Sequence, residues 1–438
     1  MATFFIHALG CKVNTYEIES VKESLLRKGL TLTFDYTAAD YILINTCCVT
    51  NTAQSKSRQK ISHYRHENKN AILIVMGCYV QGFEDEIKKL YNVNLLVGTK
   101  DRSKIVEYID KLEHDKQISL VEDAQNNLFY ENLHVSSYSE NTRAFLKIQD
   151  GCNNFCSYCI IPYVRGRIKS RKKEEVIEEA KTFIKQGYKE IVLIGIHTGS
   201  YGKDLNDYTF SDLVEELLKL EGLYRLRVSS IEESEIDDKF IYLMKHSSIL
   251  AQHLHIPLQA GSDHILKLMN RKYDADTFLK KMEYIKEQVP NVAITTDIIV
   301  GFPQESQDDF EQNLKLSQQI GFAKIHVFPY SSRNNTIAAK MSGQIHGSIK
   351  KLRAKQLIAL SDQLASTFNQ KYLNQEVEVL IEEIKEGYAI GHTTNFIKVK
   401  CKIDTTKVHK NDIIKVRIIN CNSEYVEAIR EDEINETK

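Results

Sequence analysis

Short apolar runs alternate with helical patterns over the first 110 residues or so. After the first run, apolar residues keep helical spacing, Asn14 and Glu17 have the spacing of a capping box, and Gly29 ends the pattern. Strands that alternate with helices predict a parallel sheet with helices packed on it. The runs that predict strands are residues 4–7, 41–44, 72–76 and 95–97.

A second set of strand-like runs begins near residue 144, after a polar and poorly periodic segment at 110–140 that is typical of a linker. Helical stretches such as 174–186 and 306–320 separate these runs. Six β/α units are fewer than the eight of a closed α/β barrel, so we expect a partial, open barrel. The runs are residues 144–148, 190–194, 224–228, 252–256, 293–300 and 324–328.

From residue 375 onward, apolar and polar residues alternate, which predicts a small antiparallel β-barrel of five strands. Cys401 and Cys421 lie within these strands, and we interpret both as core residues. The fold class is therefore α/β, with three domains at residues 1–125, 140–368 and 372–433.

Composition narrows the class of protein. The chain has 438 residues, a net charge of -1 and nine cysteines, an odd number that is unevenly distributed. Such a set does not predict a disulfide framework, and clustered cysteines in a reducing compartment are more often metal ligands or catalytic groups. No apolar run approaches the length of a membrane span and no signal peptide is evident. We expect a soluble, cytoplasmic, monomeric protein whose nucleic-acid binding, if any, comes from local patches.

Cys152, Cys156 and Cys159, here named the loop triad, directly follow the first strand of the predicted barrel with the spacing C-x3-C-x2-C. Three thiolates hold three irons of a cubane cluster and leave the fourth iron open to a substrate or cofactor. The alternative is a structural zinc site, which usually takes paired C-x2-C ligands and needs a fourth ligand. The spacing favours the cluster.

Cys11, Cys47 and Cys78, here named the front triad, each follow one strand of the predicted N-terminal sheet. The carboxyl ends of parallel strands meet at one edge, where open sheets bind ligands. Taken singly, each cysteine is better interpreted as a small buried core residue. Three of them at equivalent positions favour a second cluster. Cys48, next to Cys47, is expected to point elsewhere.

The loop triad resembles the motif of the radical S-adenosylmethionine (SAM) superfamily, in which SAM binds the open iron and is cleaved to a 5′-deoxyadenosyl radical. Over nearly its whole length the chain resembles the methylthiotransferase family, whose last domain is called TRAM. The motifs that carry this resemblance are, in order, LGCKVNTYE, NTCCVTNTA, GCYVQ, GCNNFCSYCIIPYVRGRIKSR, LIGIHTGSYGKD, RVSSIE, HIPLQAGSDHIL, TDIIVGFP and HVFPYSSR.

The resemblance implies two 4Fe-4S clusters, one on each triad, and two molecules of SAM that together insert sulfur and a methyl group into an unactivated C–H bond. Tyr158 is placed where the superfamily sets a ring against the adenine of SAM. Four residues at or near the ends of barrel strands are candidates for further SAM contacts, namely Gly195, Ser230, Gln259 and Asp297. Four histidines in the same strands are interpreted as core residues rather than ligands, namely His197, His253, His255 and His326.

A basic run borders the loop triad, and this position favours phosphate binding over a merely solvated face. The wording PYVRGRIKSR together with IHTGSYG is most similar to the branch that methylthiolates C2 of threonylcarbamoyl-adenosine beside the tRNA anticodon. The predicted nucleic-acid contacts are Arg165, Arg167, Lys169, Arg171, Lys172, Lys173 and Arg333.

The sequence leaves two alternative functions open. The first is that of a sister branch of the family, which acts on isopentenyl-adenosine in tRNA or on ribosomal protein S12. The second, of another class, is that of an iron-sulfur RNA-binding redox sensor. The expected partners are a tRNA anticodon stem-loop and an electron donor such as flavodoxin or ferredoxin.

Overall fold

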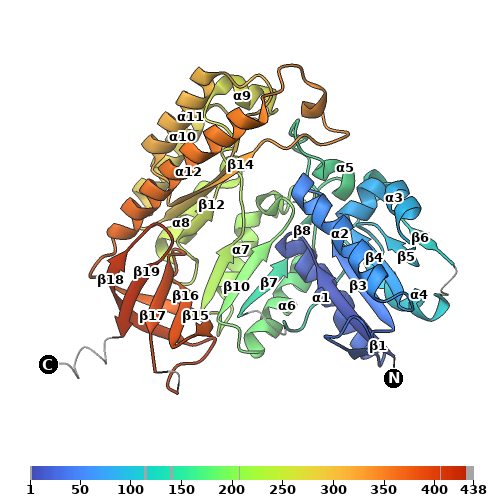
Figure 1. The fold of residues 1–438 in the computed structure, drawn as a ribbon. Coiled ribbons are helices and arrows are strands. Elements are labelled where there is room, and N and C mark those ends of the chain that lie inside the picture. Colours follow the sequence, from blue (N-terminus) through green and yellow to red (C-terminus); the bar gives the residue numbers. More distant parts are fainter. Residues whose placement is uncertain (1, 113–115, 139–141, 207, 405, 431–438) are drawn as a thin grey trace.

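The computed structural model describes residues 2–112, 116–138, 142–206, 208–404 and 406–430 (Figure 1). Parallel sheets with helices occupy the first three quarters of the chain, and a closed β-barrel follows. The predicted fold class is therefore confirmed. The proposed domain boundaries stay predictions, and the boundary residues 1, 140 and 433 lie outside the described residues. None of the described helices is long and apolar enough to cross a membrane.

The N-terminal sheet is parallel, as predicted, with the strand order β2-β1-β3-β4-β5-β6. Helices α1 and α4 cover one face and α2 and α3 cover the other. The strands are β1 (Thr3–Ala8), β2 (Thr31–Leu32), β3 (Tyr41–Thr46), β4 (Ile72–Gly77), β5 (Leu95–Val97) and β6 (Ile118–Leu120). The helices are α1 (Lys12–Arg27), α2 (Asn51–Glu67), α3 (Cys78–Leu90) and α4 (Ile105–Tyr108).

Two local predictions for this sheet are wrong. Strand β6 lies within the segment predicted as a linker, because Ile118 and Leu120 pack against the face covered by α4 although the flanking residues are polar. The predicted capping box is absent from α1, which begins at Lys12. The side-chain amide of Asn14 instead donates to the carbonyls of Leu9 and Thr46, at 2.7 and 3.1 Å.

Six parallel strands form the predicted partial barrel as two sheets, β11-β10-β7 and β12-β13-β14, which meet at a single parallel bridge between Leu226 and Leu250. The edge strands are β7 and β14, and a small β8-β9 pair extends the first strand. The strands are β7 (Arg143–Lys147), β8 (Gln149–Asp150), β9 (Lys169–Ser170), β10 (Glu190–Ile194), β11 (Arg225–Val228), β12 (His253–His255), β13 (Ala293–Val300) and β14 (Lys324–Pro329).

Amphipathic helices pack around this barrel and bury the largest apolar cluster of the protein between them and the strands (Figure 1). They are α6 (Lys173–Lys185), α7 (Phe210–Leu218), α8 (Asp238–His246), α10 (Ala275–Gln288), α11 (Gln307–Ile320) and α12 (Gly347–Gln370). Helix α5 (Ile161–Arg165) packs instead in the apolar cluster of α2 and α3, and α9 (Asp263–Leu268) lies in a separate small cluster. Short 3-10 turns lie at Arg102–Lys104, Ile109–Lys111, Ala124–Asn126, Thr198–Ser200, Glu233–Glu235 and Ala338–Lys340.

The C-terminal barrel closes in the order β15-β16-β17-β19-β18. The prediction of an antiparallel barrel needs one correction, because β17 and β19 pair in parallel and this pair helps to close the barrel. Cys401 is buried in its core, as expected, whereas Cys421 is half-buried at the end of β18. The strands are β15 (Glu376–Lys385), β16 (Tyr388–His392), β17 (Lys398–Lys402), β18 (Ile413–Cys421) and β19 (Val426–Arg430).

Candidate functional site

The loop triad lies on the irregular segment between β8 and α5, at the carboxyl end of the first barrel strand. Backbone amides point at its sulfurs: Asn154 N–H donates to Cys152 Sγ at 3.5 Å, and Ile161 N–H donates to Cys159 Sγ at 3.4 Å. Burial, together with the charges of Cys156 and Cys152, raises the pKa of Cys159 to about 12. The three thiols therefore lie close enough to act on one another electrostatically.

Two side chains that the sequence did not single out as thiol partners contact the same triad. His197 Nδ1 lies 3.7 Å from Cys152 Sγ, and Arg271 Nη1 donates to Cys156 Sγ at 3.5 Å. Burial alone would lower the pKa of His197, but its contacts with Cys152 and Glu235 raise it to about 10. The sequence could have indicated this contact only through the position of His197 after β10, because the loop triad lies at the same edge of the barrel.

The front triad converges at the carboxyl edge of the N-terminal sheet, because β1, β3 and β4 are neighbouring strands. A Cβ added to Gly10 would lie 3.0 Å from Cys47 Sγ, which places Cys47 against the turn that carries Cys11. Burial raises the pKa of Cys78 to about 12, and the charges of Cys47 and Cys11 add to this rise. The sheet therefore brings all three thiols together, as the strand positions predicted.

Cys48 faces away from this edge. Its side chain is buried among apolar residues of α2, α3 and β3, and its Sγ donates to the carbonyl of Cys78 at 3.3 Å. The position agrees with the expectation that Cys48 points elsewhere. That it is dispensable stays a prediction.

Arg333 connects the two triads electrostatically. Its guanidinium is acted on by Cys48 and Cys47 from the front sheet and by Cys159 from the barrel. The side chain is only 3% exposed, and Nη1 donates to Gln54 Oε1 at 3.2 Å. Nε and Nη2 have no hydrogen-bond partner within the part of the chain that the structure describes. Two buried donors are thus available between the triads.

Arg165 is another predicted phosphate contact that the structure places inside the protein. It is 1% exposed, donates from Nε to Cys78 Sγ at 3.1 Å, and pairs with Glu17 and with Asp150 Oδ2 at 3.3 Å. Burial alone would raise the pKa of Glu17, but Arg102, Arg165 and Lys147 lower it well below its usual range. The same cations hold the pKa of Asp150 low.

Four of the seven residues predicted to contact phosphate are buried in the structure: Arg165, Lys169, Arg171 and Arg333. Arg171 pairs with Glu179, and Lys169 Nζ donates to the Arg165 carbonyl at 2.9 Å. The sequence could not reveal this, because neighbouring members of one basic run face opposite ways, with Arg165, Lys169 and Arg171 inward and Arg167 outward. The remaining three, here named the surface cations, are exposed or partly exposed: Arg167, Lys172 and Lys173.

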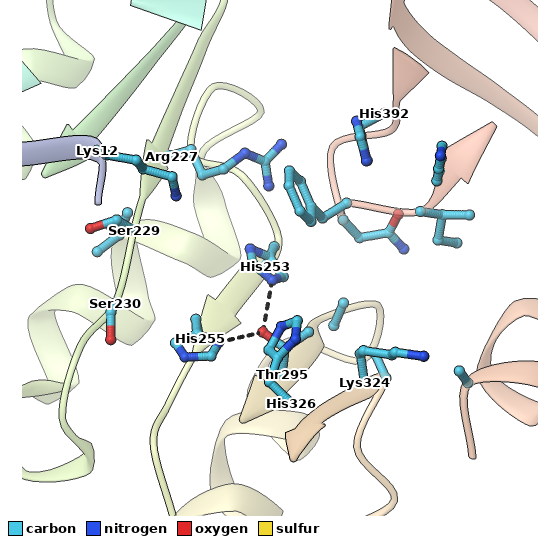
Figure 2. A pocket seen from close by; sticks show the side chains of 18 of the residues that line it. Lys12, Arg227, Ser229, Ser230, His253, His255, Thr295, Lys324, His326 and His392 are labelled. Atoms are coloured by element: carbon cyan, nitrogen blue, oxygen red, sulfur yellow. Dashed lines mark hydrogen bonds between the residues drawn. The ribbon is translucent and has the colours of Figure 1, made fainter. Parts of the chain in front are cut away.

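A cavity of about 850 Å³ lies where the barrel, the turn after β1 and the C-terminal barrel meet. Figure 2 shows Lys12 and Arg227 near the top, Ser229 and Ser230 below Lys12, and His253, His255 and His326 below Arg227. The Thr295 hydroxyl lies within hydrogen-bond distance of His253 Nε2 and His255 Nδ1, at 3.1 and 3.0 Å. Cys11 of the front triad also lines this cavity.

The predicted SAM contacts divide between this cavity and its surroundings. Gly195 and Ser230 line it, and a Cβ at Gly195 would come within 2.9 Å of Gln149 Oε1, so a larger residue there would have to displace the Gln149 side chain. Gln259 has φ of 67° and its N–H donates to the Asp297 carbonyl at 2.8 Å. The Tyr158 ring instead packs edge-on against Phe302, 6.4 Å between centroids.

Asp297 stands in a group that lines or borders the cavity. Its carboxylate lies 3.2 Å from His255 Nε2, and ligand atoms of His255, Asp297 and His326 all lie within 4.8 Å of one another. Burial and the charge of His255 lower the pKa of His326, and burial lowers the pKa of His253 well below its usual range. The sequence analysis interpreted these histidines as core residues. In the structure, however, His255 and His326 border open space.

Family models match both parts of the chain that carry the cysteine triads. A model of the radical SAM superfamily matches residues 146–317, and a model described as uncharacterized protein family UPF0004 matches residues 3–98. The threonylcarbamoyladenosine tRNA methylthiotransferase MtaB of Bacillus subtilis (strain 168) is 42% identical, with 100% of this chain and 99% of that protein covered. The chain belongs to the radical SAM methylthiotransferase family.

Other members of the family are also similar. The MtaB enzyme of Thermotoga maritima is 36% identical and covered over 91% of both chains. The tRNA-2-methylthio-N(6)-dimethylallyladenosine synthase of Acetivibrio thermocellus is 34% identical, over 95% of this chain and 88% of that one. The solved radical SAM methyltransferase TsrM from Kitasatospora setae has a TM-score of 0.58 at 12% identity over 77% of each chain, a likeness of fold alone.

Radical SAM methylthiotransferases are enzymes that use an iron-sulfur cluster and SAM, and the residues around the triads fit an anionic cluster. A cysteine thiol loses its proton when it binds a metal. Iron binding therefore offsets the raised pKa of a buried cysteine. Guanidinium groups then stand beside the sulfurs: Arg271 at Cys156, Arg165 at Cys78, and the unpartnered donors of Arg333 between the triads. The donor set and the surrounding charge are therefore compatible with iron-sulfur ligation at both places.

Proposed function

We propose that this methylthiotransferase modifies C2 of threonylcarbamoyl-adenosine next to the anticodon of tRNA. The observation that carries the proposal is the likeness, at 42% identity over the whole chain, to an enzyme named for that substrate. The placement of the six cysteines in two separate triads supports it, because sulfur insertion needs both a radical and a sulfur source. A tRNA substrate is also named for the other relatives.

Each triad is proposed to hold one 4Fe-4S cluster with an open iron. When bound, the clusters and two molecules of SAM supply the radical that removes hydrogen from the unactivated C–H bond, the sulfur, and the methyl group. The protein's own part is geometric. Arg333 spans the region between the triads, and the Arg165 network joins Glu17 of α1 to Asp150 beside the loop triad. Both fix the distance between the two halves of the site.

The cavity is proposed to receive the target base. Its volume of about 850 Å³ lies within the range of small-molecule sites. The loop of the C-terminal barrel at Phe396 closes one side of the cavity, with its ring stacked on His253 at 4.8 Å between centroids. A closed wall excludes water, which would otherwise quench a reactive centre.

The surface cations are proposed to bind backbone phosphates as the anticodon loop approaches. Arg167 stacks on Phe155 with its guanidinium 4.8 Å from the ring centroid, directly beside the loop triad. Lys173 lies over the Tyr208 ring at 4.7 Å. A low-potential one-electron donor such as flavodoxin or ferredoxin would reduce the cluster of the loop triad.

Mass spectrometry of tRNA nucleosides from a strain without this gene tests the proposal. We expect 2-methylthio-threonylcarbamoyl-adenosine to be lost and threonylcarbamoyl-adenosine to accumulate. The wild-type gene should restore the product, and a gene with either triad changed to alanine should not. Cys401→Ser is the matched control, because this cysteine lies in the core of the C-terminal barrel. Loss of 2-methylthio-isopentenyl-adenosine, or of a modified ribosomal protein S12, with the expected nucleoside intact would refute the proposed substrate.

A further inference from the structure

The charged residues that line the cavity are mostly cationic: Lys12, Arg227, Lys324 and Lys398, against Glu424. Their partners differ. Arg227 donates to both carboxylate oxygens of Glu190, at 2.7 and 3.2 Å, and to the carbonyls of Thr393 and Thr394. Lys324 Nζ donates to Asp362 Oδ1 at 3.0 Å. These two cations are therefore already neutralised or satisfied by the protein itself.

Lys12 is different. It is the first residue of α1, directly after Cys11, and its side chain reaches into the cavity beside Arg227 (Figure 2). Its ammonium makes no hydrogen bond and no ion pair in the ranges that the structure describes. Glu190, a nearby carboxylate, is shared by Arg225 and Arg227 and so does not neutralise Lys12. An ammonium in this position is complementary to an anionic ligand that enters from outside.

The start of α1 adds to this preference. Its N-cap residue, Cys11, accepts no hydrogen bond from the backbone N–H groups of the first turn, and Lys12 and Val13 both line the cavity. The positive end of the helix dipole thus points to the same space as the ammonium. Lys12 and the helix end together favour a carboxylate at this wall, beside the thiol of Cys11.

The proposed substrate offers such a group. Threonylcarbamoyl-adenosine carries a carboxylate on its N6 substituent, whereas a dimethylallyl substituent is a hydrocarbon. An unpaired ammonium that faces a hydrocarbon would lose hydrating water without gaining a hydrogen-bond partner, and this desolvation would weaken binding. We propose that Lys12 binds the carboxylate of the threonylcarbamoyl group and so selects this nucleoside. The inference rests on the proposed function and names the residue that determines its specificity.

Binding of anticodon stem-loops to the reconstituted, cluster-loaded protein tests this inference without turnover. Three RNAs of one sequence are compared by fluorescence anisotropy: unmodified adenosine, threonylcarbamoyl-adenosine, and its neutral methyl ester. Wild-type protein should bind the carboxylate form about 10- to 100-fold more tightly than the other two, as expected for a charge-assisted hydrogen bond. Lys12→Met should remove that advantage and leave the affinity for the unmodified RNA unchanged, whereas Lys12→Arg should keep most of it.

Lys398→Met is the matched control, since this lysine lines the same cavity from the first residue of β17. It should leave the preference for the carboxylate intact. Iron content and SAM affinity of Lys12→Met should equal those of the wild type, which separates carboxylate binding from damage to the front triad. An equal loss of affinity for all three RNAs would show that Lys12 binds a phosphate and would overturn the inference. A preference that survives Lys12→Met would overturn the inference alone, and a wild-type protein without any preference would overturn the proposed substrate as well.

Discussion

Exchanging Arg165 for methionine tests whether the basic run binds phosphates or holds the protein together. Arg165 is 1% exposed and contacts Glu17, Asp150, Asn14 and Cys78. Methionine fills similar space without charge, so Glu17 would keep Arg102 and Lys147 as counter-charges, and Asp150 would keep Lys147, Lys169 and Arg102. Removing one partner of a buried ionic network costs about 3–5 kcal/mol.

That cost lowers the apparent unfolding temperature by roughly 6–20 °C, from about 2–4 °C per kcal/mol for domains of this size. Differential scanning fluorimetry of the cluster-loaded protein under anaerobic conditions measures it. Arg167→Met, two residues along the same run and exposed, is the matched control and should change the unfolding temperature by about 2 °C or less. If Arg165→Met unfolds at the wild-type temperature and instead weakens tRNA binding with a flatter salt dependence, our assignment of Arg165 to the interior is wrong.

Other measurements test the remaining assignments. Reconstituted wild-type protein should carry about eight irons, and alanine at the loop triad should halve the iron and abolish 5′-deoxyadenosine release. Alanine at the front triad should also halve the iron but leave that release measurable while the methylthio product disappears; full iron content there would rule out a second cluster. Cys48→Ser should keep all the iron, and loss of one cluster would show that Cys48 rather than Cys47 is a ligand. Methionine at all three surface cations should flatten the log-log salt slope of tRNA binding by about 2, at about 0.7 per contact, and an unchanged slope would place the phosphate contacts elsewhere. Because the pKa of Glu17 and Asp150 is lowered in the folded protein, their stabilisation is complete above about pH 4.3 and is lost as pH falls below that value. Acid unfolding followed by circular dichroism should therefore begin at higher pH in Arg165→Met than in wild type, and coincident curves would contradict the network.

The order of strands and helices and the grouping of the cysteines could be predicted from the sequence, because both depend on local pattern. Apolar runs of three to eight residues predicted the parallel strands, and the position of Cys11, Cys47 and Cys78 after three of those strands predicted that they meet. Strand β6 was not predicted, because its three residues include Ser119 and lie in a polar segment, whereas the equally short β5 is wholly apolar.

Burial of charge was decided only by the tertiary structure. Arg165 and Arg167 are two residues apart and look alike in sequence, yet one is enclosed by Glu17 and Asp150 and the other is exposed. Glu17 lies more than 120 residues from Asp150, so no local pattern records that they share a cation. The same holds for Lys12, whose open ammonium is defined by cavity walls from the barrel and the C-terminal barrel. The sequence determined which residue types stand at which positions. The partner of each charge depended on which distant segments fold against it.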